Sequence, residues 1–263
     1  MKRRRGSPVW WLVLIAGLIY FFLPLYATLE FSLRAKPFLA AYTNSFSDPG
    51  FVGSLLYSLA VAAGTIMASL ALVVPTAYWV NVRVPRARPF VEFVTLMPFV
   101  IPAVVLVFGL IRVYSGPPLP FTHSQLGSTL LLAFAYVVLS LPYMYRAVDT
   151  GLRSIDVRSL TEAAQSMGAG WGTIVLRVIL PNLRVAIVSG AFLTLAIVLG
   201  EYTIASFLAR PAFGPYLNLL SGYKAYEPAA VSLVSFALTW IAMGAIAFLG
   251  RATRTRIEIG GAR

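Results

Sequence analysis

The sequence contains no cysteine and one histidine, His123, among 263 residues. Without cysteine, the chain cannot form disulfides, thiolate metal sites or a cysteine nucleophile. One histidine also excludes a multi-histidine metal centre. Charge is scarce too, because charged residues make up 11% of the chain and hydrophobic residues 59%. Soluble domains carry about 25% charged residues, so the excess apolar surface must face lipid and a soluble globular protein is excluded.

Acidic residues are the scarcest charged type, with nine against 21 lysines and arginines, for a net charge of +12. In a soluble protein this balance would indicate a nucleic-acid partner. Here the basic residues lie in short segments between apolar runs, so we interpret them as signals of membrane topology and predict no nucleic-acid partner. Membrane lipids are the expected surroundings.

Six apolar runs are long enough to cross a bilayer, which takes about 20 residues. They cover residues 9–29, 53–80, 90–112, 128–147, 183–208 and 228–250. The first run is longer than the apolar part of a signal peptide, so we treat it as a retained span. The sequence therefore predicts an all-α integral membrane protein, with residues 1–263 forming one transmembrane domain of six helices.

The basic residues predict the orientation, because short cytoplasmic segments retain lysine and arginine. Sixteen of the 21 lie in four segments on one predicted side. They are Lys2, Arg3, Arg4, Arg5, Arg83, Arg86, Arg88, Arg146, Arg153, Arg158, Arg177, Arg184, Arg251, Arg254, Arg256 and Arg263. The other five, Arg34, Lys36, Arg112, Arg210 and Lys224, lie on the opposite side. We therefore expect both termini, and the loop at about 149–182, to be cytoplasmic.

That loop carries a spaced motif. Glu162-Ala163-Ala164 is followed after three residues by Gly168, and further on by Val178, one residue, and Leu180-Pro181. Asp156 or Ser154 could cap a helix ahead of the motif. Its predicted apolar side consists of Val157, Leu160, Ala164 and Met167, with Ala163 nearby, and glycine at 168 would end it. Trp171 to Leu180 would form a second apolar run that ends at Pro181.

This spacing resembles the "EAA" loop of the permease subunits of binding-protein-dependent (type I) ABC importers, with Val178 in place of the usual isoleucine. The resemblance implies a cytoplasmic coupling helix that docks on an ATPase through Glu162, Ala163, Ala164, Met167, Gly168 and Leu160. It also implies an importer of a bacterial inner membrane, with an ATPase dimer, a second permease subunit and an extracytoplasmic solute-binding protein. The second permease subunit is either a copy of this chain or, as the habit of the family favours, a related chain. ATP and Mg²⁺ would bind the partner ATPase and no cofactor would bind this chain, which has no Walker-type loop. We therefore expect a non-catalytic subunit.

An ordinary amphipathic helix lying at the membrane interface would give the same periodicity without any partner. The joint occurrence of Glu-Ala-Ala, the glycine and Leu-Pro in a predicted cytoplasmic loop between the fourth and fifth runs favours docking.

Glu201 lies within the fifth apolar run, followed by Tyr202. A carboxylate inside a membrane is costly and usually faces a cavity or a partner. We therefore treat Glu201 and Tyr202 as candidates for the translocation pathway, where they would favour a cationic solute. The alternative is a structural hydrogen bond to Tyr202, Ser189 or a backbone carbonyl.

The run from Gly200 to Leu208, with Arg210-Pro211 after it, resembles the permeases for polyamines, ferric iron, thiamine and phosphonates more than the sugar branch. The resemblance implies a small solute, with a polyamine such as spermidine or putrescine as the first choice. A sugar, ferric iron, thiamine or a phosphonate is the alternative within the family.

Two other classes of function compete with this interpretation. An ion-driven secondary transporter would carry paired broken helices and several intramembrane ionisable groups, whereas Glu201 is the one strong candidate in the sequence. An intramembrane enzyme would need a nucleophile with a base, or a metal cluster, inside the bilayer. The sequence offers no convincing pair of that kind.

Overall fold

The computed structural model describes residues 8–252, and every regular element among them is a helix. The predicted all-α fold is confirmed for this part of the chain. The longer α-helices are α1 (Pro8–Leu33), α2 (Ala40–Ser47), α3 (Pro49–Val82), α4 (Arg88–Leu96), α5 (Ala103–Tyr114), α6 (Gln125–Arg153), α7 (Val157–Ser166), α10 (Arg184–Gly200), α12 (Phe213–Tyr223) and α13 (Glu227–Ala252). Shorter elements are η1 (Pro85–Ala87), η2 (Met97–Phe99), η3 (Phe121–His123), α8 (Trp171–Thr173), η4 (Ile174–Ile179), α9 (Leu180–Asn182) and α11 (Thr203–Phe207).

The basic terminal residues used to predict the orientation, Lys2 to Arg5 and Arg254, Arg256 and Arg263, lie outside the described residues. The chain divides into two compact units. Unit 1 contains the chain up to Val52 and Leu217–Thr239, and unit 2 contains Gly53–Tyr216 and the chain from Trp240.

Three helices, α1, α3 and α6, are long and apolar enough to cross a membrane as continuous segments. α13 is apolar over Glu227–Ile241, and the other apolar segments are two bent pairs of helices. Each of the six predicted runs falls on one of these segments. How many of them cross the membrane stays a prediction.

Two of the predicted runs are interrupted in the structure. Over 90–112, the segment Pro85–Phe99 meets α5 at 98°. Pro98 and Pro102 explain this bend, because proline lacks an N–H and disfavours helical geometry in the residue before it. The run over 183–208 is likewise two helices, since α10 ends at Gly200 and the backbone is extended at Glu201 before α11.

Unit 1 has a small core of Ala35, Ala40, Ala41 and Ala230, which packs beside Tyr42 and Tyr226. The rings of Phe31 and Tyr226 lie 5.1 Å apart between centroids. Along α1 the large apolar side chains are exposed on all sides of the helix. A helix that is apolar all round is suited to lipid contact.

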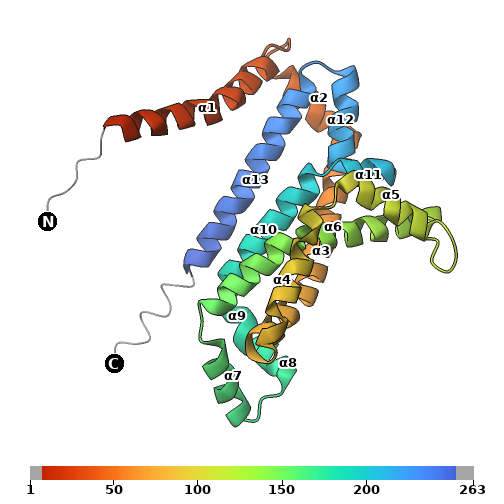
Figure 1. Cartoon of the computed structure of the whole chain (residues 1–263). Helices are drawn as coiled ribbons and strands as arrows, with labels where there is room; N and C mark the ends of the chain where they lie inside the picture. The colour runs from red at the N-terminus through yellow and green to blue at the C-terminus, as the bar shows by residue number, and fades with distance from the viewer. Residues whose placement is uncertain (1–7, 253–263) are drawn as a thin grey trace. The chain divides into compact units, whose positions relative to one another are not determined.

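Unit 2 contains two larger cores, one packed on the second half of α6 and the other on its first half. The first joins α3, α6, α7 and η4 through residues such as Tyr78, Val148, Ala164 and Ile174. The second joins α3, α5, α6, α10 and α11 and includes Leu132. Figure 1 shows α7 and α8 together at one end of this unit, beyond the ends of α6 and α10. The first core therefore attaches the α7 segment to the long helices.

α6 packs closely against the start of α10 at Gly151. A Cβ added to this glycine would lie 2.6 Å from the Cβ of Ala186 and 3.0 Å from Cδ2 of Leu183. Real Cβ atoms do not approach that closely, and the methyl of alanine cannot rotate away. Any larger residue at 151 must push the two helices apart.

We predict that Gly151→Ala destabilises the protein in detergent by about 1–3 kcal/mol, because overpacking outweighs the gain in helix propensity. Gly64→Ala in α3 is the matched control, since a Cβ there meets nothing within 4 Å. Thermal unfolding of both variants checks this. Equal melting temperatures for the two variants would contradict the close packing of α6 on α10.

Candidate functional site

The predicted coupling helix is α7, and Asp156 caps its start. Oδ1 of Asp156 accepts a hydrogen bond from the Ser159 N–H at 3.1 Å, and Oδ2 accepts one from the Ser159 hydroxyl at 2.6 Å. These bonds lower the pKa of Asp156 below its ordinary value. Ser154, the other candidate cap, instead donates to the Gly151 carbonyl at the end of α6. Of the two candidates, Asp156 is therefore the N-cap of α7.

Gly168 follows the end of α7 with φ +79°, the left-handed conformation that glycine adopts without strain. The Gly168 N–H donates to the Gln165 carbonyl at 2.9 Å, and the Ala169 N–H donates to that of Ala164 at 3.0 Å. These bonds satisfy carbonyls that the helix end would leave unpaired. The chain reverses here, as the motif predicts.

The second apolar run is a continuous helical segment formed by α8, η4 and α9, with a π-helical stretch over Ile174–Ile179. Its end differs from the prediction. Pro181 lies inside this helical segment, where it lacks an N–H but does not end the helix, and the break comes at Leu183. There the segment meets α10 at 79°.

One face of α7 is buried against the rest of unit 2. Thr161 and Ala164 are 2% and 3% exposed. The hydroxyls of Thr161 and Tyr78 lie 3.2 Å apart in a hydrogen bond. Ala164 belongs to the first core, beside Val157. The small side chain of Ala164 therefore lets α7 approach its own core, whereas we expected it to let a partner approach.

The opposite face of α7 is open. Glu162, Ala163 and Gly168 are exposed, Leu160 is half-buried, and Met167 is 81% exposed. We name Glu162, Ala163, Met167 and Gly168 the docking face. It presents a carboxylate, two small residues and a flexible apolar side chain, a mixture suited to an apolar groove bordered by donors.

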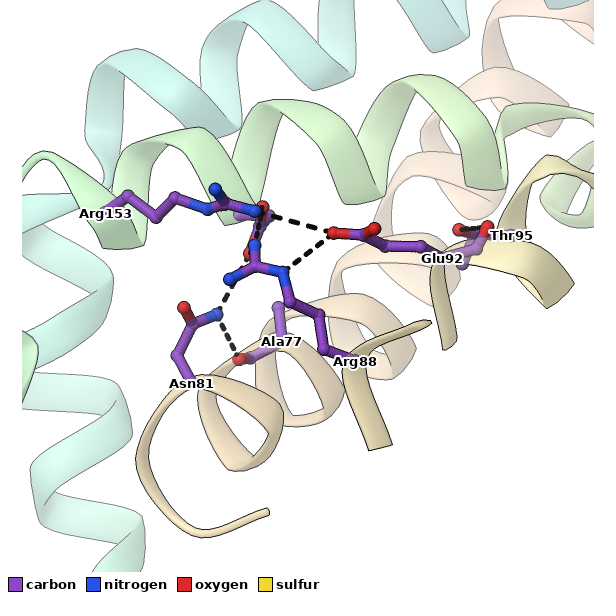
Figure 2. A network of polar contacts seen from close by, with 7 residues as sticks. Ala77, Asn81, Arg88, Glu92, Thr95 and Arg153 are labelled. Atoms are coloured by element: carbon purple, nitrogen blue, oxygen red, sulfur yellow. Dashed lines mark hydrogen bonds and ion pairs between the residues drawn. The ribbon is translucent and has the colours of Figure 1, made fainter. Parts of the chain in front are cut away.

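A charged network in unit 2 includes Asn81, Arg88, Glu92 and Arg153 (Figure 2). It centres on Asp149, which is 7% exposed. Nη2 of Arg88 donates to both carboxylate oxygens, at 2.9 and 2.7 Å. Nδ2 of Asn81 donates to Oδ1 and Nε of Arg153 to Oδ2, each at 3.0 Å. Glu92 accepts from Nε of Arg88 at 2.8 Å. The network thus joins α3, α4 and α6.

The charges of this network support one another. Hydrogen bonds with Asp149 and then Glu92 raise the pKa of the Arg88 guanidinium above its ordinary value. Sequence reasoning overlooked Asp149, the carboxylate at the centre of the network. The available signal was a rare acidic residue next to the fourth apolar run, four residues before Arg153, which is the spacing of a helical ion pair.

Glu201 lies at the break between α10 and α11. Its Oε1 accepts from the Ile204 N–H at 2.8 Å, and its Oε2 accepts from the Ala205 N–H at 3.2 Å and the Tyr136 hydroxyl at 3.0 Å. Glu201 thus makes structural hydrogen bonds, as the alternative interpretation expects, but with different partners. Ser189, one of the partners considered, donates to the Val185 carbonyl instead. Tyr202 is 45% exposed. A pathway role for Glu201 and Tyr202 stays a prediction.

We predict that Asp149→Asn destabilises the protein by about 1–3 kcal/mol, because the guanidinium of Arg88 loses the more buried of its two carboxylate partners. Glu30→Gln is the control. It removes a pair with Arg34 whose side chains are 46% and 60% exposed, and such pairs contribute about 0–1 kcal/mol. Thermal unfolding measures both.

A double-mutant cycle with Arg88→Gln separates the pair from its surroundings. If Arg88 and Asp149 are coupled, the double variant loses less free energy of unfolding than the two single variants lose in total. Simple additivity would show that the two side chains do not act together.

The sequence of this chain is similar to those of several known transport proteins. The chain is 31% identical over 192 residues to the "Probable ABC transporter permease protein" of Sinorhizobium fredii, covering 71% of this chain and 32% of that protein. It is 29% identical over 243 residues to the "Probable molybdenum ABC transporter permease protein" of Haloferax volcanii, covering 89% and 86%. It is 29% identical over 128 residues to the spermidine/putrescine permease of Escherichia coli, covering 49% and 46%. The chain thus spans about a third, most and about half of these three relatives.

Among solved structures, the chain resembles one from a bacterial alginate ABC transporter in complex with an alginate pentasaccharide-bound periplasmic protein. The TM-score is 0.70 at 16% identity, covering 93% of this chain and 94% of that one. This likeness supports the fold. The family model described as "Binding-protein-dependent transport system inner membrane component" matches residues 60–255. Because that match includes the α7 segment and most of the sequence, the chain belongs to the family of binding-protein-dependent ABC transporter permeases.

Proposed function

We propose that this chain forms part of the membrane pathway of an ATP-driven importer and that α7 transmits the motion of a partner ATPase to the transmembrane helices. The observation that carries the proposal is the docking face, open on one side of a helix whose other side is fixed to unit 2. Family membership supports it independently.

A lever of this kind needs a rigid attachment. Thr161 binds Tyr78 of α3, and Ala164 packs into the core formed with α6 and η4. Asp149 then ties α6 to α3 and α4 through Asn81 and Arg88. Motion imposed on α7 therefore moves these helices as one body, because packed cores do not deform continuously.

The docking face also defines the partner. Met167 offers apolar surface for a groove, and Glu162 offers acceptors for cationic or N–H donors in the rim of that groove. We assign this partner as an ATPase dimer that binds ATP and Mg²⁺. A second, related permease and an extracytoplasmic solute-binding protein complete the proposed importer. We place it in a bacterial inner membrane with α7 and both termini in the cytoplasm, on the distribution of basic residues.

The proposed solute is small and is delivered by the binding protein, with a polyamine such as spermidine or putrescine as first candidate. The likeness to the E. coli spermidine/putrescine permease supports it. The charge of Glu201 gives less support than expected, because both its oxygens already accept hydrogen bonds. A molybdenum-containing anion is the second candidate, favoured by the relative that matches 89% of this chain.

The two solutes can be separated by transport. We expect membrane vesicles holding the intact importer and its binding protein to accumulate labelled spermidine when ATP is present, with no competition from molybdate. Accumulation of molybdate that spermidine does not reduce would replace the polyamine by the anion. Uptake that follows an ion gradient without ATP would contradict the importer itself and favour a secondary transporter.

For the docking face we predict that Gly168→Val lowers both capture of the ATPase and solute uptake by about tenfold or more, since valine is strained at positive φ. Gly168→Asn is the matched control, because asparagine tolerates this conformation and a Cβ at 168 meets nothing within 4 Å. Co-purification of the ATPase and uptake in vesicles are measured together. Wild-type capture and uptake by the valine variant would defeat the proposal.

A charge series tests the same face without changing the backbone. Glu162→Lys should weaken ATPase capture more than Glu162→Gln, because lysine repels the donors that the carboxylate attracts while glutamine keeps an acceptor. Equal capture by both variants would remove Glu162 from the contact.

A further inference from the structure

A polar cavity of about 440 Å³ lies between α4 and α6 in unit 2. Tyr145, in its wall, is 4% exposed, and its hydroxyl has no hydrogen-bond partner among the described residues. A buried hydroxyl without a partner costs free energy that a ligand in the cavity would recover. The cavity wall also contains Arg146, Thr150 and Arg153.

A second cavity, of about 720 Å³, adjoins the first and is mainly apolar. It is lined by Leu96, Phe99, Tyr143, Val185, Ala186 and Leu193. The two cavities share the residues Leu96, Pro142, Arg146 and Thr150. Each volume lies in the range of about 300–1,000 Å³ typical of ligand pockets. A molecule that lies across these shared residues would therefore meet a polar surface at one end and an apolar surface at the other.

Among the charged side chains around the shared wall, one arginine has no carboxylate partner within the described residues. Arg88 and Arg153 are paired with Asp149 and Glu92, two guanidiniums with two carboxylates. Arg146 is exposed and makes no ion pair or side-chain hydrogen bond within residues 8–252. A single negative charge at the junction of the cavities would be matched by this guanidinium.

We propose that these two cavities hold one phospholipid, with its phosphodiester at Arg146 and the Tyr145 hydroxyl and an acyl chain in the apolar cavity. A phosphodiester carries one negative charge and acceptor oxygens, which fits one free guanidinium and one free hydroxyl donor. The apolar lining does not suit a small charged solute, because it offers such a solute no partners. Arg146 also lies at the end of α6 predicted to be cytoplasmic, where phospholipid headgroups lie.

Occupation of this site would have a mechanical consequence. Asp149, Glu92 and Arg153 line the polar cavity and also form the network that joins α3, α4 and α6. A lipid bound there stabilises the attachment of α7 by mass action, since it binds the folded arrangement alone.

The experiment uses the full chain, purified and delipidated in detergent, with dioleoyl-phosphatidylglycerol added in mixed micelles. Thermal unfolding gives an apparent Kd, and native mass spectrometry counts bound lipids. We expect Tyr145→Phe and Arg146→Ala each to weaken the apparent affinity roughly tenfold, the loss of one hydrogen bond to a charged group. Arg177→Ala is the control, since Arg177 is exposed and lines neither cavity.

Tyr145→Phe also changes a second quantity, the melting temperature of the lipid-free protein, in the opposite direction to its effect on lipid affinity. It removes the unpaired hydroxyl, so the lipid-free variant should melt at or above the wild-type temperature while binding phosphatidylglycerol less well. A loss of stability without lipid would show that the hydroxyl has a structural partner, which overturns the proposal.

Two further outcomes overturn it. Inorganic phosphate that protects as well as the lipid would indicate a site for a free anion. Lipid binding that is unchanged in both Tyr145→Phe and Arg146→Ala would place the lipid elsewhere. Neither result depends on ATPase capture or solute uptake, so this test and that of the proposed function fail separately.

Discussion

The buried carboxylate of Asp149 is the contact on which the mechanical continuity of unit 2 depends. It accepts four hydrogen bonds from Asn81, Arg88 and Arg153, which come from α3, α4 and α6. Removing a carboxylate from water is expensive, and multiple donors are what make the burial favourable. Because each donor comes from a defined helix position, the carboxylate also fixes the register of those helices.

α7 depends on this register. Asp149 lies on the last turns of α6, and α7 begins only a few residues later at Val157. Asn81 and Tyr78 lie within one turn of each other on α3, so the helix that binds Asp149 also binds Thr161 of α7. The charged network and the first core therefore both hold α3 and α6 together, the network by hydrogen bonds and the core by apolar packing. If α7 couples to an ATPase as proposed, a docking face held in this way would move with these helices.

The sequence predicted the helical class and the α7 segment because both depend on local patterns. Apolar runs identify lipid-facing helices, and Asp156 and Gly168 mark the two ends of α7 by capping chemistry that needs no distant partner. The inward face of α7 was assigned less well. Ala164 and Met167 are both apolar, yet one is buried and the other exposed, because burial depends on where α3 and η4 lie.

Long-range pairing and bends explain the remaining differences. Arg88 and Asp149 are 61 residues apart, so no local window connects them. Pro98 and Pro102 signal the bend before α5, but the bend at Leu183 comes two residues after Pro181 and depends on backbone dihedrals that hydropathy does not report.

Glu201 is the unusual residue of the fifth apolar run, and the structure gives its carboxylate hydrogen-bond partners that no local sequence pattern indicates. An acidic residue in an apolar run signals a functional carboxylate only if the run stays helical, because helical N–H groups are then occupied and the charge must find another partner. Here the helix stops at Gly200, and the first N–H groups of α11 are free to donate to the carboxylate. The carboxylate of Glu201 accepts hydrogen bonds from the N–H groups that the helix break leaves unpaired, and the Tyr136 hydroxyl links this cap to α6. A solute could use this carboxylate only by displacing those donors, so the geometry of the break and the chemistry of the pathway cannot be varied independently at this position.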